Sequence, residues 1–318
     1  MRHLLSFLAV GAASVLVITG CASGAPHSAA HSRAAATTGA PTPSHAPVVT
    51  AADRAAAAKS LAALEREYDA TVGVVATDTA TGETLSYRGD RRFGYASTLK
   101  VFAVGEFLRS VHGSERAARV HWSAADVARA GYSPETGQHV ADGLTYSQLA
   151  EAAVRQSDNT ALNLVLERIG GPKALDEALS GLGDATTQVV HDEPELNTIE
   201  PGSTEDTTTP AAFTASLAAL LNGRTLDASD TALLERWMSG NATGDTLIRA
   251  GAPSGWTVAD KSGGAGGIRN DIARVSRPGG GPIVLSVLTT KNDPDAAYDD
   301  ALVAKTASTV LAVFDTGR

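Results

Sequence analysis

The chain has 318 residues, 43% hydrophobic and 19% charged, with a formal net charge of -9. This balance suits one large globular domain or two ordinary ones, and the acidic charge argues against nucleic acid as a partner. A single Cys excludes an intramolecular disulfide, and the eight scattered His give no zinc spacing, so no metal is expected.

Residues 1–20 are predicted to be a signal peptide, because a basic start precedes an apolar run over residues 4–18. The run is shorter than an ordinary membrane span. Ile18-Thr19-Gly20-Cys21 resembles a bacterial lipobox, in which the Cys is lipidated. A lipid on Cys21 would hold a secreted protein at the outer face of the plasma membrane. The alternative is ordinary cleavage near residues 22–25, which would release the protein.

Residues 22–49 are rich in Ala, Ser, Thr, Pro and His and show no apolar periodicity. This composition predicts a flexible linker, because it cannot bury enough surface to offset its conformational entropy. Residues 21–50 are therefore interpreted as a lipidated Cys with its linker. Residues 51–318 are interpreted as the catalytic domain.

The first elements of that domain are a helix and two strands. Apolar residues at helical spacing predict a helix over residues 51–68, with Asp53 as its cap. Residues 71–76 and 83–87 read as strands joined by a turn. Ser97 opens an apolar segment typical of a buried helix, and helical patterns continue to about Met238.

Strands return late in the chain. They are predicted over residues 256–260, 271–275 and 283–289, before an amphipathic helix over residues 298–314. This order predicts an α+β fold with an antiparallel sheet flanked by helices and built from both chain ends. Its α/β part would comprise residues 51–90 and 241–318. Residues 91–240 would form an inserted all-helical part, with a site in the cleft between the two.

The first motif that carries chemistry is Ser97-Thr98-Leu99-Lys100. Ser and Lys three apart lie on one helix face, so the amine can reach the hydroxyl. A serine is a poor nucleophile until a base takes its proton, and a buried lysine has a lowered pKa that suits it for this task. The alternative is an exposed helix pair, which the apolar surroundings argue against.

Two further motifs follow. Ser157-Asp158-Asn159 places small polar residues within an apolar helical segment, where they either cap a helix or serve a reaction. Ser157 would relay a proton and Asn159 would bind a substrate amide. Lys261-Ser262-Gly263-Gly264 follows a predicted strand, so that a substrate could lie against the backbone and the Gly264 N–H could face an oxyanion. A plain turn with an exposed lysine is the alternative.

The three motifs in this order resemble the signature of serine β-lactamases and penicillin-binding proteins, and the resemblance extends over residues 51–314. It implies that Ser97 is acylated, that Lys100 and Ser157 handle protons, and that no cofactor is needed. It also implies a monomer. The residues that would bind the substrate carboxylate are Lys261, Ser262 and Gly263.

Glu193-Pro194-Glu195-Leu196-Asn197 resembles the omega loop of class A β-lactamases. The resemblance implies that Glu193 is the deacylation base, that Asn197 is its partner in holding a water, and that Glu195 is structural. An acidic surface loop is the alternative. Such a base separates a β-lactamase from an alternative penicillin-binding DD-peptidase or β-lactam sensor, which would acylate without fast hydrolysis.

Other residues also fit the family pattern. Tyr132 resembles the aromatic that lines its cleft, with a packed loop aromatic as the alternative. Arg269 stands where many class A enzymes have an arginine for the substrate carboxylate, and Asn163 is expected to support the base. Gly264 stands where a larger residue is common, which leaves the preference among β-lactams open.

His191 departs from the pattern, because the family usually has an arginine there that pairs with the aspartate matching Asp206. A histidine is shorter and only partly charged near neutral pH. We therefore expect a looser omega loop. A catalytic His191, as in a Ser-His hydrolase, is the alternative, but no Gly-x-Ser-x-Gly elbow accompanies it.

Overall fold

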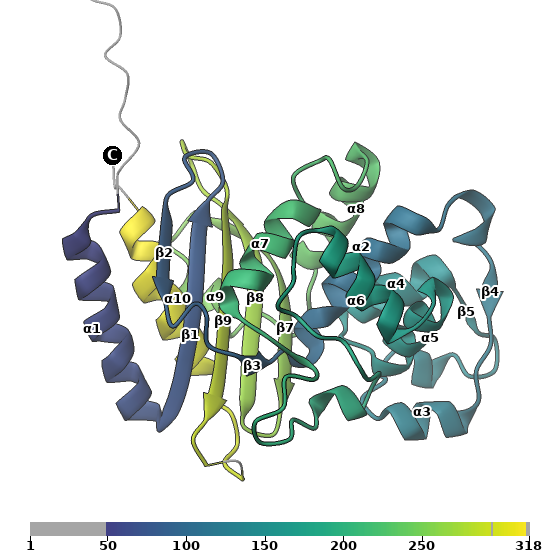
Figure 1. Cartoon of the computed structure of the whole chain (residues 1–318). Helices are drawn as coiled ribbons and strands as arrows, with labels where there is room; N and C mark the ends of the chain where they lie inside the picture. Colours follow the sequence, from purple (N-terminus) through teal and green to yellow (C-terminus); the bar gives the residue numbers. More distant parts are fainter. Residues whose placement is uncertain (1–48, 294, 316–318) are drawn as a thin grey trace, which may run out of the picture. The chain divides into compact units, whose positions relative to one another are not determined.

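A five-stranded antiparallel sheet organises the part of the chain that the computed structural model describes, residues 49–293 and 295–315 (Figure 1). Its strand order is β2-β1-β9-β8-β7. The strands are β1 (Ala70–Asp78), β2 (Thr84–Tyr87), β7 (Thr257–Ala265), β8 (Ile268–Ser276) and β9 (Ile283–Lys291). β1 pairs with β9 from Ala70↔Lys291 to Asp78↔Ile283, so the sheet is assembled from both chain ends, as predicted.

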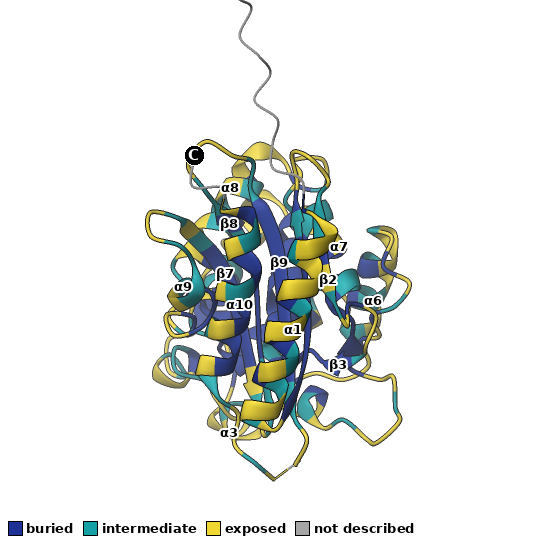
Figure 2. Cartoon of the chain, turned by 90° about the vertical axis from the view of Figure 1, so that its left-hand side faces the viewer, coloured by how far each residue is buried: buried dark blue, intermediate teal, exposed yellow. Residues whose placement is uncertain are grey.

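Three helices cover one face of this sheet: α1 (Ala51–Tyr68), α9 (Ile248–Gly251) and α10 (Asp300–Phe314) (Figure 2). Their apolar sides join strand residues in one core, in which Leu61, Leu285 and Val303 have no exposed surface. α1 begins with a capping box, in which Thr50 is the N-cap and Asp53 bonds back to the Thr50 N–H. The prediction of Asp53 as the cap was therefore wrong in position, since Asp53 is the third residue of the helix.

A second core lies on the other face of the sheet. It is built from α2 (Lys100–Ser110), α4 (Tyr146–Arg155), α5 (Asn159–Ile169), α6 (Pro172–Gly181), α7 (Pro210–Leu220) and α8 (Ala228–Ser239). The short helix α3 (Ala124–Ala130) contacts α5. α7 packs directly on β1 and β9, so one helix of the segment assigned to the helical part lies on the sheet.

The described chain also contains two short ladders that were not predicted. β3 (Phe93–Gly94) pairs with β6 (Thr207–Thr208), and β4 (Arg119–Val120) pairs with β5 (Leu144–Thr145). Strands of two residues show no alternation of apolar and polar residues, which is the signal used to predict strands. The β3–β6 ladder ties the segment before Ser97 to the end of the loop that carries Glu193.

Cys21, with the predicted signal peptide and linker, lies outside the described residues. Among the helices of the described residues, none combines the length and apolar character required to span a membrane.

Candidate active site

A cleft of about 570 Å³ lies beside the edge strand β7. It brings together ten of the predicted site residues: Ser97, Tyr132, Ser157, Asn159, Glu193, Asn197, Ser262, Gly263, Gly264 and Arg269. Lys100 and Lys261 have no exposed surface, and hydrogen bonds link both to residues of the cleft. Every predicted site residue that the structure describes therefore lies in or directly beneath one cleft.

Ser97 lies in a tight turn of 3-10 helix (Ala96–Leu99) that leads directly into α2. The turn is held from β8, where the Asn270 side chain donates to the backbone oxygens of Gly94 at 2.8 Å and Tyr95 at 3.2 Å. β7 approaches it closely: a Cβ on Gly263 would lie 3.0 Å from the Ser97 nitrogen. A glycine is therefore required there, and the nucleophile is fixed against the strand edge.

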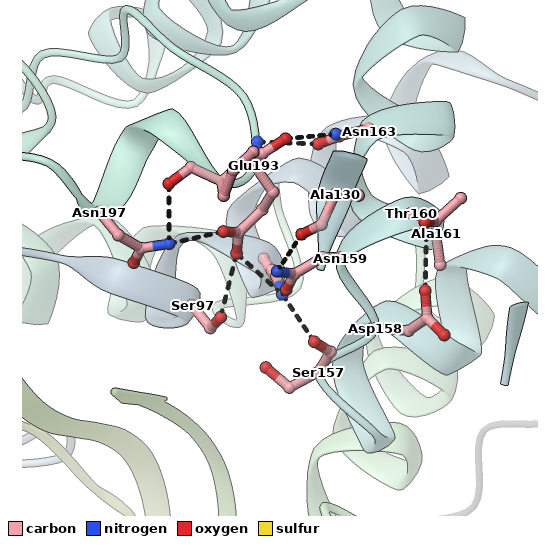
Figure 3. Close-up of polar contacts among 12 residues, drawn as sticks. Ser97, Ala130, Ser157, Asp158, Asn159, Thr160, Ala161, Asn163, Glu193 and Asn197 are labelled. Atoms are coloured by element: carbon pink, nitrogen blue, oxygen red, sulfur yellow. Dashed lines mark hydrogen bonds and ion pairs between the residues drawn. The ribbon is translucent and has the colours of Figure 1, made fainter. Parts of the chain in front are cut away.

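A charged pair lies next to this serine. The Ser97 hydroxyl donates to Glu193 Oε1 at 3.3 Å (Figure 3). Lys100 Nζ lies 3.0 Å from the same oxygen. Lys100 and Glu193 are almost completely buried. Burial lowers the pKa of Lys100, and the Glu193 carboxylate partly opposes that shift.

The Ser157-Asp158-Asn159 motif forms the break between α4 and α5 and is not interior to a helix. Asp158 is the N-cap of α5, which confirms the predicted capping role for this one residue of the motif. Its Oδ2 also accepts hydrogen bonds from the Glu135 and Thr136 amides. Asn159 Oδ1 accepts from Lys100 at 2.6 Å. Its amide nitrogen donates to Ala130 at 2.8 Å, and a second N–H remains for a ligand.

Lys261 lies inside β7, so the Lys-Ser-Gly motif is part of the strand and does not follow it. Its Nζ donates to Ser157 Oγ at 3.0 Å and to the Ser262 carbonyl at 2.6 Å. Burial, and next the like charge of Lys100, lowers the pKa of Lys261 to about 7. The alternative of an exposed lysine on a turn is wrong.

Glu193 is held by one residue of α5 and by one residue of its own loop. Asn163 on α5 accepts from the Glu193 N–H at 2.9 Å and donates to its carbonyl at 2.8 Å. Asn197 donates to Glu193 Oε2 at 2.6 Å, and its own buried Oδ1 accepts no hydrogen bond from the described residues. Glu193 is buried, so the alternative of a merely acidic surface loop is wrong for this residue. Glu195 is exposed.

His191 pairs with Asp206, the partner expected from the resemblance for an arginine at this position. Its Nδ1 lies 2.5 Å from Asp206 Oδ2, and this hydrogen bond raises the pKa of His191. Asp206 Oδ1 also accepts from the Tyr95 hydroxyl at 2.6 Å and from the Val190 and His191 amides. The loop therefore keeps an ion pair that depends on pH. His191 is not one of the described residues that line the cleft.

Tyr132 and Arg269 contribute to the cleft walls. Tyr132 is 58% exposed, so the alternative of a packed loop aromatic is wrong. Arg269 on β8 is held by Asp300, with 2.6 Å between Nε and Oδ1.

Five lining residues were not predicted: Ala242, Thr243, Asp245, Thr246 and Tyr298. Thr243 shares a hydrogen bond of 2.6 Å with Ser262. None of the five belongs to one of the spaced motifs. They reach the cleft because they lie in the segments that lead into β7 and α10.

The chain is similar to known proteins over most of its length. A model described as "Beta-lactamase enzyme family" matches residues 56–314. Beta-lactamase 3 of Bacillus cereus is 45% identical over 253 residues, which are 79% of each chain. Beta-lactamase ROB-1 of Haemophilus influenzae is 41% identical over 97% of this chain and 98% of its own. The crystal structure of a class A β-lactamase from Clostridium kluyveri has a TM-score of 0.78 and 44% identity, over 81% of this chain and 98% of that one.

Proposed function

This chain belongs to the β-lactamase enzyme family as a class A serine enzyme that hydrolyses β-lactams, and we propose how its cleft residues carry out that reaction. Ser97 Oγ attacks the carbonyl carbon of the lactam, the C–N bond breaks, and an acyl-serine forms. Water then hydrolyses the ester and releases the ring-opened acid. Hydrolysis inactivates the antibiotic, so the enzyme confers resistance.

The contact between Ser97 and Glu193 supports this assignment most directly. Ser97 Oγ already donates to Glu193 Oε1 at 3.3 Å, which favours Glu193 as the acceptor of the serine proton during acylation. Lys100, at 3.0 Å from the same oxygen, is the other candidate base and balances the charge of Glu193. The Ser97 and Gly264 amides stabilise the oxyanion.

The leaving nitrogen takes a proton from Ser157, whose hydroxyl Lys261 supports at 3.0 Å. Lys261, Ser262, Gly263 and Arg269 bind the substrate carboxylate, while Asn159, Asn197 and Tyr132 contact its amide side chain. Arg269 can bind a carboxylate with two parallel hydrogen bonds.

Deacylation is what separates this enzyme from a DD-peptidase or a sensor. Glu193 accepts the proton of the hydrolytic water, and the Asn197 amide shares in binding that water. The buried Asn197 Oδ1, which accepts no hydrogen bond from the described residues, supports this role. Asn163 fixes the position of Glu193 through its backbone and does not touch the substrate.

We further propose that the protein is secreted and anchored to the outer face of the plasma membrane through a lipid on Cys21, and that it acts as a monomer. Secretion and the lipid anchor are inferred from the apolar run before the lipobox-like Ile18-Thr19-Gly20-Cys21 and from the position of the chain's single Cys there. The monomer is inferred from the resemblance to the family alone. The division of residues 51–318 into an α/β part (51–90 and 241–318) and a helical part (91–240) also remains a proposal.

The deciding experiment follows penicillin consumption with substrate in large excess over the protein. Many turnovers per molecule are expected from the wild type, whereas a burst of one equivalent that stalls would indicate a peptidase or sensor. Glu193→Gln keeps the shape of the side chain, and we expect it to lower kcat by at least about 10³-fold and to accumulate an acyl-enzyme visible by mass spectrometry.

Glu195→Gln is the matched control, because Glu195 is an exposed carboxylate on the same loop. It should turn over within about twofold of the wild type. Rapid turnover by Glu193→Gln would refute the assignment of the deacylation base.

A further inference from the structure

The wall of the cleft at Arg269 contains an aromatic side chain that belongs to none of the sequence motifs. Tyr298 precedes α10, lines the cleft and is 43% exposed. Its ring centroid lies 4.8 Å from the guanidinium carbon of Arg269, within the range of a cation–π contact. The ring is therefore positioned by the guanidinium while much of its surface remains open to the cleft.

Gly264 on β7 allows this arrangement. A Cβ at residue 264 would lie 3.0 Å from an Arg269 terminal nitrogen and 3.2 Å from Tyr298 Cε1. Both distances are tighter than ordinary contacts, so a side chain there would displace the ring or the guanidinium by a few tenths of an ångström. The unusual glycine thus brings Tyr298 and Arg269 up to the strand edge on which the substrate lies.

Arg269 is itself held by an ion pair. Its Nε lies 2.6 Å from Asp300 Oδ1, and Asp300 Oδ2 accepts from the Thr246 hydroxyl at 2.5 Å. Within the described residues, the two terminal nitrogens donate no hydrogen bond, so both are available to a carboxylate. Tyr298 consequently lies next to the point where a bound carboxylate must be.

We propose that Tyr298 is a specificity-determining residue that contacts the substituent next to the carboxylate of the substrate and favours a planar one. This inference rests on the proposed function, because it takes Arg269 to bind that carboxylate. In a cephalosporin the carboxylate is on C4 and the substituent on the doubly bonded C3, so the two lie side by side. In a penicillin the neighbouring carbon carries two methyl groups, which offer no face for stacking.

The test compares three substrates on the wild type, Tyr298→Ala and Tyr298→Phe. Two are cephalosporins with the same amide side chain, one with a styryl group at C3 and one with a methyl group, so that neither expels a leaving group. The third is a penicillin. Tyr298→Ala should lower kcat/KM for the styryl compound about 3- to 10-fold, mainly through KM, and change the other two less than about twofold. Tyr298→Phe keeps the ring and should retain the wild-type preference.

Gly264→Ala provides an independent variant, because its methyl group crowds both the Tyr298 ring and the Arg269 guanidinium without removing either. A displaced guanidinium would affect all three carboxylate substrates alike, so the quantity compared is the ratio of kcat/KM between the styryl and the methyl compound. Gly264→Ala should reduce the advantage of the styryl compound over the methyl compound. An equal loss on all three substrates with Tyr298→Ala would mean that Tyr298 only supports Arg269, and unchanged kinetics would mean that it touches no substrate; either result overturns the inference. Failure of the wild type to hydrolyse any of the three would instead refute the proposed function.

Discussion

Lys261 is the residue whose charge is most sensitive to pH within the proposed carboxylate site. Its ammonium group is fully buried and its pKa is lowered to about 7, first by burial and then by the nearby charge of Lys100. Because the protonated form attracts the substrate carboxylate, the competent fraction of free enzyme falls as the pH rises above that value. We expect kcat/KM for penicillin to show an alkaline limb near pH 7, read from a pH–rate profile.

Lys261→Arg separates charge from geometry, since a guanidinium stays protonated over this whole range. The variant should be slower at pH 6 because the longer side chain fits the buried position poorly, but its kcat/KM should stay flat to pH 9. A wild-type profile without a limb below pH 9 would mean that Asp260 and Asp271, whose charges favour the protonated lysine, outweigh burial and repulsion.

For single residues, the sequence predicted the members of the spaced motifs well, because a short spacing along the chain constrains local geometry. Ser97 and Lys100 are one turn apart, and Asp158 caps the helix that begins with Asn159. Contacts across the fold could not be predicted in the same way. Thr243 meets Ser262, and Tyr298 meets Arg269, only because separate elements converge at the cleft.

The loop that carries Glu193, the omega loop, contains an ion pair whose charge depends on pH. His191, rather than an arginine, pairs with Asp206, and the hydrogen bond from Asp206 raises the pKa of His191. A raised pKa in the folded state means that the stabilisation is full below about pH 6.5 and is lost as the pH rises through the folded-state pKa. Glu195 and Glu205 also face the imidazole and favour its charged form.

We therefore expect the loop to be better protected at pH 6 than at pH 8.5. Hydrogen exchange of the Val190 and His191 amides, which both donate to Asp206, is the direct measurement, and limited proteolysis of the loop is the second. His191→Arg should remove the pH dependence and raise Tm by about 1–3 °C at pH 8.5, with little change at pH 6. Equal protection at both pH values would show that the ion pair does not control the loop.

The predicted bounds were accurate for some elements and too short for others. The helix over residues 51–68 has the predicted bounds, whereas β7 runs on through Lys261 to Ala265. Apolar periodicity stops at the polar Lys261 and Ser262, but backbone pairing with β8 continues past them. Pairing partners depend on the whole sheet and leave no local pattern in the strand.

On the scale of the whole molecule, the sheet packs against one hydrophobic core on each face. The cleft lies at the β7 edge of the sheet, and α1 lies at the other edge. α1 packs on β1, β2 and α10, whereas the cleft adjoins β7 at the far end of the strand order. The fold class was predictable because strands occur near both ends of the domain with helices between them. The packing of α7 on the sheet was not, because an apolar helix face does not specify which partner it meets.

The separation between α1 and the cleft leads to a prediction about the proposed lipid anchor. Since α1 packs on β1 and β2, at the other edge of the sheet from β7, we expect an attachment through Cys21 to leave the cleft chemistry unchanged. In a bacterial host, the full chain should fractionate with membranes, and Cys21→Ser should move the activity to the soluble secreted fraction with kcat/KM within about twofold. Mass spectrometry of the N-terminal peptide should show acyl groups on Cys21 only in the wild type. An unmodified wild type that begins after Cys21 would instead establish ordinary signal cleavage and a freely secreted enzyme, with the catalytic assignments unaffected.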